Sequence, residues 1–280
     1  MNQTLRHGDR SQAVLQLQKQ LNQAGASLFA DGHFGDATEA AVRAYQLKVG
    51  LVADGIAGPK TMQALAGADC SRLLTNTALV KAAKRLGVEL AIAYAVNEVE
   101  SQGEGFLANG KPKILFERHV MHERLALPRN EGDDVIALKA HADELARVYP
   151  NLVNPRPGGY AGGTAEHQRL AQARLLDALC APESASWGAF QVMGYHWERL
   201  GYASLEDFTT RMAKDEGEHF EAFIRFIEAD PALLKALKGK KWAQFAKLYN
   251  GPAYARNLYD TKLERAYERH AACGCAQEAA

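Results

Sequence analysis

A short stretch near the N-terminus occurs twice and decides the fold of this region: Ala30-Asp31-Gly32-His33-Phe34-Gly35-Asp36-Ala37-Thr38 returns as Ala53-Asp54-Gly55-Ile56-Ala57-Gly58-Pro59-Lys60-Thr61. Both copies follow the pattern A-D-G-x-x-G-x-x-T. Because Asp bonds its own backbone and Gly accepts a positive φ, each copy predicts a turn, and the Thr can then open or cap a helix. We interpret Asp31, Gly32, Asp54 and Gly55 as turn formers rather than ligand contacts.

Apolar residues at helical spacing surround the first turn. Val14, Leu17 and Leu21 precede it. The set that follows it is Ala41, Val42, Tyr45 and Val49. This spacing is typical of helices with one buried face. Together with the two turns, it predicts a compact three-helix unit.

The same region carries a longer pattern, L-x-x-G-x-x-S-x-x-V-x-x-L-Q-x-x-L. Its residues are Leu5, Gly8, Ser11, Val14, Leu17, Gln18 and Leu21. With the two turns, the pattern resembles the peptidoglycan-binding domain 1 family over about residues 5–66. The resemblance implies a module that binds bacterial peptidoglycan, through its stem peptide, in a shallow groove between helices. The spacing does not identify the side chains that line this groove.

The chain of 280 residues exceeds the usual domain of roughly 100–200 residues, so a second domain is expected. The small-residue stretch from Ala66 to Ser71 indicates the boundary, which gives domains 1–68 and 69–280. Beyond it the apolar spacing stays helical. The predicted helices are 77–86, 89–100, 134–149, 166–178, 188–200, 204–230 and 242–249. Lys113–Glu117 predicts a strand or the start of a helix, and Pro155–Gly163 a loop of the Gly-rich kind that is often functional.

The stretch Val99-Glu100-Ser101-Gln102-Gly103 places a carboxylate at the end of an apolar helix. Packing there desolvates the carboxylate and favours its protonated form, while the Gly turn opens a cleft beside it. A carboxylic acid that stays protonated near neutral pH is what the cleavage of a glycosidic bond requires of its general acid. Glu100 is therefore the candidate acid, and Glu98, on another side of the helix, is its rival.

Further motifs follow in order after E-S-x-G, namely S-W-G-A-F-Q-V-M-G from Ser186 and Y-N-G from Tyr249. This order resembles the lysozyme-like superfamily, which includes lytic transglycosylases and goose-type lysozyme. With I-L-F-E-R-H from Ile114, it looks like the N-acetylmuramidase domain of modular phage endolysins over about residues 75–270. The resemblance implies a mainly α, lysozyme-like domain that hydrolyses the β-1,4 bond between N-acetylmuramic acid and N-acetylglucosamine, with Glu100 as catalytic acid.

A second carboxylate is predicted at Glu117, in F-E-R-H. As a base across the sugar it would activate water in an inverting reaction. The alternative is a structural ion pair with Arg118 or a neighbouring Arg. His119 either orients Glu117 by a hydrogen bond or is a structural histidine.

The remaining motif residues divide into cleft and core. Gln191 is expected to bind a sugar N-acetyl group or the catalytic carboxylate, since an amide both donates and accepts. Tyr249 and Asn250 are expected to line the same cleft, and Tyr254 to stack on a sugar face. The sequence also predicts that Trp187 and Phe190 fill the core and that Ser186 caps the helix 188–200.

Composition limits the partners. Lys and Arg together number 33, as do Asp and Glu, so no global positive field attracts nucleic acid or anionic membrane. We expect peptidoglycan as partner, no nucleic acid, no stable membrane association, and a monomer. The N-terminus is polar and no run of about 18 apolar residues occurs, which predicts neither a secretory nor a membrane address.

Cysteines and histidines give no sign of a cofactor. The four cysteines, Cys70, Cys180, Cys273 and Cys275, are too few for a disulfide framework, which favours synthesis in a reducing cytosol, and the last two are interpreted as tail thiols. The histidines show no H-E-x-x-H or H-x-x-E-H spacing of a zinc amidase. We predict no metal and no cofactor.

These observations favour a phage endolysin that accumulates in the host cytosol and reaches the wall once the inner membrane is permeabilised. One alternative is a lytic transglycosylase, in which the same Glu acts as acid and then as base while the sugar closes a 1,6-anhydro ring. Another is a noncatalytic wall-binding or phage structural protein.

Overall fold

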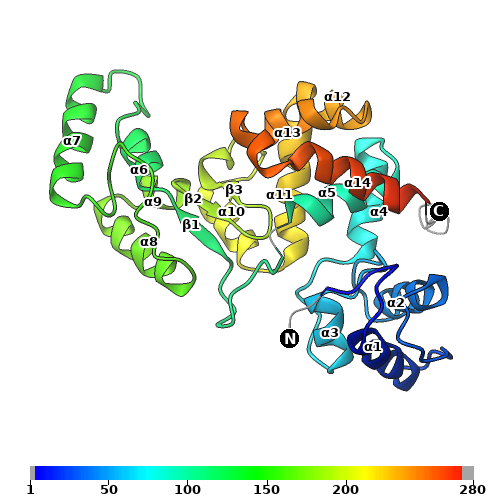
Figure 1. Ribbon diagram of the computed structural model, residues 1–280. Coiled ribbons are helices and arrows are strands. Elements are labelled where there is room, and N and C mark those ends of the chain that lie inside the picture. Colours follow the sequence, from blue (N-terminus) through cyan, green and yellow to red (C-terminus); the bar gives the residue numbers. More distant parts are fainter. Residues whose placement is uncertain (1–3, 102, 273–280) are drawn as a thin grey trace. The chain divides into compact units, whose positions relative to one another are not determined.

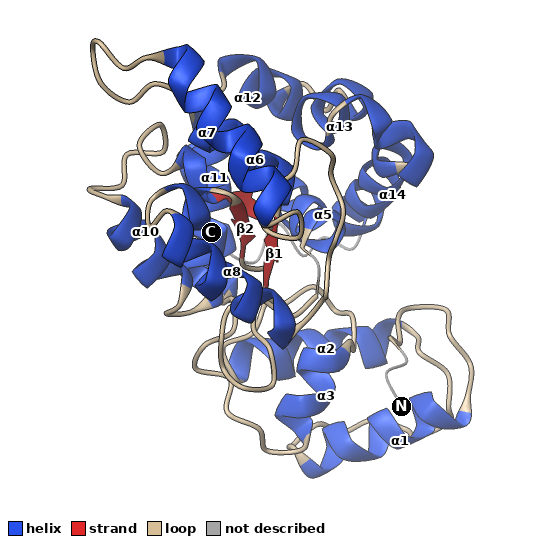
Figure 2. Cartoon of the chain, turned by 90° about the vertical axis from the view of Figure 1, so that its left-hand side faces the viewer, coloured by secondary structure: helices blue, strands red, loops and turns tan. Residues whose placement is uncertain are grey.

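The computed structural model describes residues 4–101 and 103–272, so that Gln102 and the two tail cysteines, Cys273 and Cys275, lie outside the described residues. The chain forms two compact units, residues 1–100 with 231–280, and residues 101–230. In the described ranges helices predominate and the strands form one small sheet (Figures 1 and 2). The prediction of a mainly α protein is confirmed.

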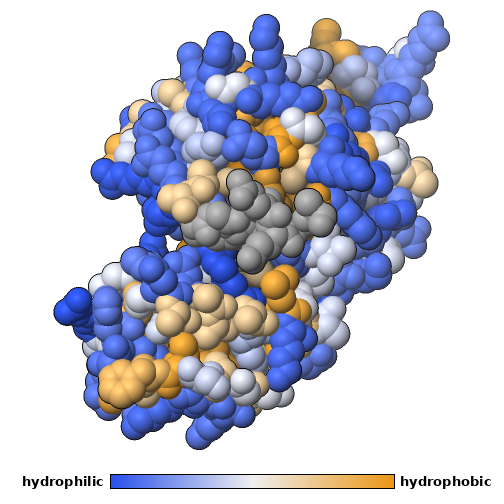
Figure 3. Space-filling view, turned by 90° about the vertical axis from the view of Figure 1, so that its right-hand side faces the viewer, coloured by the Kyte–Doolittle hydropathy of each residue, from blue (hydrophilic) through white to orange (hydrophobic). Residues whose placement is uncertain are grey.

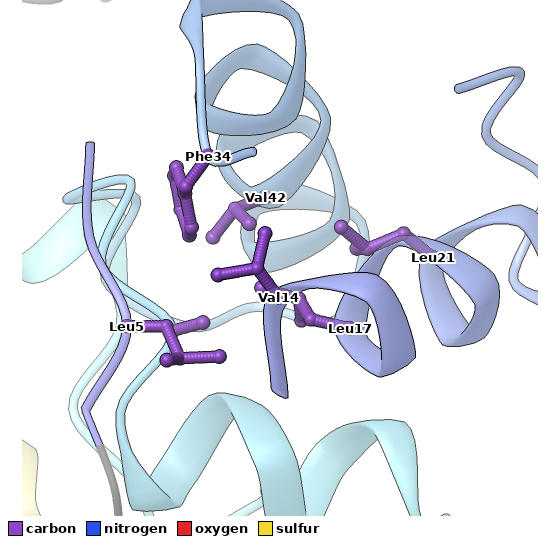
Figure 4. Packing of buried hydrophobic residues seen from close by; sticks show 7 residues of the cluster. Leu5, Val14, Leu17, Leu21, Phe34 and Val42 are labelled. Atoms are coloured by element: carbon purple, nitrogen blue, oxygen red, sulfur yellow. The ribbon is translucent and has the colours of Figure 1, made fainter. Parts of the chain in front are cut away.

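The first unit begins with the predicted three-helix module. Its helices are α1 (Gln12–Gln23), α2 (Asp36–Lys48) and α3 (Pro59–Leu65). Apolar side chains from α1, α2, the two turns and the segment before α1 pack into one core (Figure 4), against which Met62 and Leu65 of α3 lie partly buried. The core contains Leu5, Val14, Leu17, Leu21, Phe34, Val42 and Ala57. The two turns precede α2 and α3, as the repeat predicts.

Each turn is held by a buried glutamine of the preceding helix. The side-chain nitrogen of Gln18 donates to Asp31 Oδ1 (2.9 Å) and Thr38 Oγ1 (3.0 Å), and the backbone N–H of Gly32 donates to its Oε1 (2.9 Å). The second turn repeats this arrangement with Gln46, Asp54, Thr61 and Gly55. Asp and Gly therefore serve the turns in both copies, in agreement with the interpretation from the repeat.

Gln18→Leu is expected to lower the free energy of unfolding of the module by about 3 kcal/mol, because buried donors and acceptors of the turn lose their partner. Gln16→Leu is the matched control, since Gln16 is exposed on the same helix. Thermal unfolding of the two variants, followed by circular dichroism, measures the difference. Equal melting temperatures would contradict the expected contribution of the Gln18 hydrogen bonds to stability.

The rest of the first unit is a helical bundle. Its elements are α4 (Asn76–Leu86), α5 (Leu90–Glu100), α12 (Pro231–Lys238), α13 (Trp242–Asn250), the 3-10 helix η2 (Pro252–Asn257) and α14 (Tyr259–Ala272). Helix α5 is buried from Leu90 to Val96. It is tied to α14 by Glu98, which lies 2.6 Å from Arg269 and 2.9 Å from His270. The end of α5 is thereby fixed in the bundle.

The second unit is built around the sheet β1-β2-β3, whose neighbouring strands are antiparallel. Its elements are β1 (Ile114–Phe116), α6 (Arg118–Leu125), α7 (Val135–Val148), α8 (Thr164–Leu176), α9 (Cys180–Glu183), β2 (Ala185–Trp187), β3 (Val192–Met193), the 3-10 helix η1 (Gly194–His196), α10 (Leu205–Met212) and α11 (Glu216–Glu228). Ile114 pairs with Trp187, and Ser186 with Met193. The run at Lys113–Glu117 is therefore a strand that leads directly into a helix.

Two predictions of secondary structure were wrong. The segment 188–200 is not an α-helix, because Gly188 (φ 73°) and Gln191 (φ 50°) have left-handed backbones that turn the chain between β2 and β3. Ser186 is therefore a strand residue and no helix cap. The predicted helix 204–230 is divided, because the Asp215 side chain accepts the N–H of Glu218 and starts a new helix there.

Hydrophilic side chains predominate on the face of the molecule in Figure 3, with hydrophobic residues in patches between them. None of the helices in residues 4–101 and 103–272 has the length and apolar character that a membrane span needs. The described part of the chain also contains no group of three or more His, Cys, Asp or Glu residues placed to hold a metal ion.

Candidate active site

Glu100 is the last residue of α5 and only 6% of its surface is exposed. Burial raises the pKa of its carboxyl group from 4.5 to about 7, although the amide of Asn250 and the charge of Lys262 act in the opposite direction. The Asn250 nitrogen lies 3.2 and 3.3 Å from the two carboxylate oxygens. This group can hold a proton near neutral pH and transfer it to a substrate.

Glu98, the rival on the same helix, has the opposite electrostatic character. Its burial would raise the pKa, but the hydrogen bond and charge of His270 and the charge of Arg269 outweigh burial, and the pKa lies below its ordinary value. A carboxylate held in ion pairs in this way stays charged. The two glutamates are thus separated into a structural anion at Glu98 and a candidate acid at Glu100.

Tyr249 and Asn250 end helix α13 beside Glu100. Tyr249 is half-buried and stacks on Phe245, with 6.1 Å between the ring centroids. Burial raises the pKa of Tyr249 well above its ordinary value, and the charges of Glu100 and Tyr259 add to the effect. Three residues predicted for the site, Glu100, Tyr249 and Asn250, are therefore brought together within the first unit.

Glu117 lies in the second unit, where β1 passes into α6. Its carboxylate oxygen Oε2 accepts the hydroxyl of Tyr160 at 2.7 Å, and Nδ1 of His119 lies 3.2 Å from the same oxygen. The predicted pair of Glu117 and His119 is thus adjacent in space. Tyr160, which the sequence did not single out, is the hydrogen-bond donor.

Arg118 does not serve as the predicted alternative partner of Glu117. Its guanidinium donates instead to the backbone carbonyls of Pro150, Arg156 and Pro157. It therefore holds the start of the Gly-rich loop predicted at Pro155–Gly163, together with Pro150 before it.

Gln191 uses its side-chain amide within its own turn. Its oxygen accepts the hydroxyl of Ser186 at 2.7 Å, and its nitrogen donates to the carbonyl of Gly188 at 2.8 Å. Trp187 and Phe190 are buried, as predicted for core residues.

A buried histidine that the sequence did not reveal supports the same turn. The ring of His219 is 1% exposed, accepts the N–H of Ala189 at Nδ1 (3.2 Å), and approaches the carbonyl of Met212 with Nε2 (2.7 Å). Since Nδ1 accepts, the ring is neutral and carries its proton on Nε2. A Cβ atom on Gly188 or Gly105 would lie 2.5 Å from this ring, which is why both positions are glycine.

The N-terminal module has a cavity of about 410 Å³ between α1 and α2. Small and apolar residues dominate its lining. They are Leu21, Ala24, Gly25, Ala26, Ser27, Ala40, Ala41, Ala44, Tyr45 and Lys48. Glu100 is not among the residues that line this cavity.

Comparisons with known proteins match both parts of the chain. Residues 89–271 match the N-acetylmuramidase family and residues 10–65 the peptidoglycan binding domain family. The crystal structure of a Burkholderia AP3 phage endolysin is similar with a TM-score of 0.87 and 53% identity, covering 96% of this chain and 100% of that chain.

Two curated relatives are similar over a short stretch only. The zinc D-Ala-D-Ala carboxypeptidase of Streptomyces albus G is 51% identical over 61 residues, which are 21% of this chain and 24% of that protein. A protein of Bacillus licheniformis named as a probable N-acetylmuramoyl-L-alanine amidase is 46% identical over 70 residues, 24% of this chain and 20% of that one. The chain thus spans about a quarter of the first relative and a fifth of the second.

Proposed function

This chain belongs to the N-acetylmuramidase family, and we propose that it is an endolysin that binds peptidoglycan through residues 1–68 and hydrolyses the glycan strand with residues 69–280. The bond cut is the β-1,4 bond between N-acetylmuramic acid and N-acetylglucosamine. The observation that carries the proposal is the buried Glu100 carboxyl, whose pKa of about 7 keeps a large fraction of it protonated at neutral pH.

Glu100 acts as the general acid. Its proton passes to the glycosidic oxygen as the bond from that oxygen to the anomeric carbon breaks, which avoids an alkoxide leaving group. Asn250 holds the carboxyl through its side-chain nitrogen. Tyr249, its neighbour at the end of α13, lines the substrate cleft. Tyr254 stacks on a sugar face.

Glu117 acts as the second carboxylate and removes a proton from the attacking water in an inverting reaction. His119 lies against it, with Nδ1 3.2 Å from Oε2. Gln191 contributes to substrate binding from the turn that it stabilises. The stem peptide binds in the cavity between α1 and α2, where the lining of small apolar residues suits alanine side chains.

As an endolysin, the protein accumulates as a monomer in the host cytosol and reaches the wall after the inner membrane has been permeabilised. The similarity to the Burkholderia AP3 phage endolysin over nearly the whole of both chains supports this role.

Mass spectrometry of the fragments released from purified peptidoglycan tests the reaction. Hydrolysis at the proposed bond gives reducing N-acetylmuramic acid ends. Fragments with 1,6-anhydro ends would instead establish a transglycosylase, and intact peptidoglycan would establish a wall-binding protein without activity.

Asn250→Ala is expected to move the alkaline limb of the pH–rate profile to higher pH by about one unit, because a hydrogen bond that favours the ionised form of Glu100 is lost. The rate of release of reducing ends between pH 5 and 9 measures the limb. Asn109→Ala, in an exposed loop, serves as control and should keep the native profile. If the alkaline limb of Asn250→Ala is unchanged, Asn250 does not influence the pKa of Glu100.

A further inference from the structure

The two oxygens of the Glu117 carboxylate have different surroundings. Oε2 accepts the hydroxyl of Tyr160 and lies within ion-pair distance of His119, although Nδ1 of His119 is not aligned for a hydrogen bond. Oε1 has no hydrogen-bond partner among the described residues, and the side chain remains 15% exposed. One edge of the carboxylate is fixed and the other faces solvent.

Two buried carboxylates of the second unit, Glu166 and Glu183, are bound at both oxygens. Oε1 of Glu166 accepts two backbone N–H groups of the Gly-rich loop, and its Oε2 accepts Phe116 N and Arg169. Both oxygens of Glu183 accept donors from Arg129, with further donors from Arg124 and Trp197. Full satisfaction is what a structural carboxylate requires. The open oxygen of Glu117 sets it apart from these two.

The loop that carries Tyr160 is anchored on both sides of this residue. Arg118 holds the carbonyls of Arg156 and Pro157 before it, and Glu166 holds the N–H groups of Ala161 and Gly162 after it. These anchors do not involve Glu117. The backbone that carries Tyr160 is therefore held independently of the carboxylate that its hydroxyl contacts.

We propose that Tyr160 is the positioning residue of Glu117, whose hydroxyl fixes Oε2 so that Oε1 meets the attacking water. The inference rests on the proposed hydrolysis with Glu117 as second carboxylate. In that step the water oxygen bonds to the anomeric carbon as the bond from that carbon to the glycosidic oxygen breaks. One proton of the water passes to Oε1, and the leaving oxygen takes the proton of the general acid. Burial and the hydrogen bond to Glu117 both raise the pKa of Tyr160, which keeps the hydroxyl protonated and able to donate.

Tyr160→Phe in the full chain tests the proposal, with soluble glycan strands as substrate. We expect kcat to fall about 10- to 100-fold with KM and melting temperature unchanged, since only the orientation of Glu117 is lost. Tyr149→Phe is the matched control, because Tyr149 is an exposed tyrosine at the end of α7. In a Glu117→Gln background, Tyr160→Phe should cause no further loss, because the two residues act as one unit.

The outcomes separate the inference from the function on which it rests. If Glu117→Gln lowers kcat strongly while Tyr160→Phe has native kcat, the positioning role is overturned and the second carboxylate stands. If Glu117→Gln has native kcat, the assignment of the second carboxylate fails, and the inference with it. If Tyr160→Phe raises KM at native kcat, Tyr160 is a binding residue and the positioning role is overturned. If it lowers the melting temperature with a parallel loss of rate, Tyr160 is a structural residue and the positioning role is likewise overturned.

Discussion

Glu100→Gln is expected to lower kcat by roughly 10³-fold, because glutamine has nearly the shape of the protonated acid but no proton to transfer to the leaving oxygen. The substrate still binds, so KM should change little. The rate at which reducing ends are released from glycan strands measures the effect. Retention of more than about a tenth of the native kcat would refute the assignment of Glu100 as the acid.

The same substitution should stabilise the protein at alkaline pH. The Glu100 pKa is about 7 in the folded chain and near 4.5 when unfolded. Between these values the unfolded chain loses its proton first, so stability falls as pH rises, and above pH 7 the folded state carries a penalty of up to about 3 kcal/mol. Glu100→Gln removes this penalty. Its melting temperature should exceed the native value at pH 8 and match it at pH 4.

Glu98→Gln is the matched control, two residues away on the same helix. It loses the ion pairs with Arg269 and His270, whose charges hold the Glu98 pKa low. We therefore expect a lower melting temperature at neutral pH with most of kcat retained. A loss of kcat as large as that of Glu100→Gln would show that the chemistry does not discriminate between the two glutamates.

The sequence predicted what depends on local chemistry. The Asp-Gly turns before α2 and α3 follow from the repeat, and the position of Glu100 at a helix end follows from apolar spacing and a Gly. What the sequence did not reveal depends on contacts between distant segments. No local pattern shows that the turns pack onto Gln18 and Gln46. The sequence predicts Asn250 in the same cleft as Glu100, but it does not predict the contact of the Asn250 amide with the Glu100 carboxylate, 150 positions away.

The wrong helix at 188–200 has a related cause. A short buried run of apolar residues has the same pattern in a helix and in a strand, so spacing alone does not separate them. The left-handed backbones of Gly188 and Gln191 exclude the helix. Gly188 also packs against His219, a residue distant in the sequence that no spacing pattern connects with it. For Glu117 the sequence left open a catalytic base or an ion pair with Arg118 or a neighbouring Arg. Arg118 donates to loop carbonyls instead and Tyr160 donates to the carboxylate, and both contacts join segments that are distant in the sequence.

Gly188→Ala is expected to lower the free energy of unfolding by about 4 kcal/mol or more, because two costs combine. The backbone φ of 73° is strained for any L side chain, and the new Cβ would lie 2.5 Å from the His219 ring. The ring is held by Ala189 and Met212 and stacks on Phe106, so it cannot move aside. Denaturant unfolding of the variant measures the loss.

Gly201→Ala separates the two costs, since Gly201 has the same φ of 73° but nothing within 4 Å of the added Cβ. It should cost only about 1 kcal/mol, the backbone strain alone. Adding His219→Ala to Gly188→Ala opens the space, so the double variant should be destabilised by less than the sum of its two single changes. If the free-energy losses of Gly188→Ala and His219→Ala are strictly additive, or if Gly188→Ala and Gly201→Ala cost the same, the His219 ring moves aside to accept the new Cβ. In that case the Gln191 turn owes its shape to backbone conformation and not to the buried histidine.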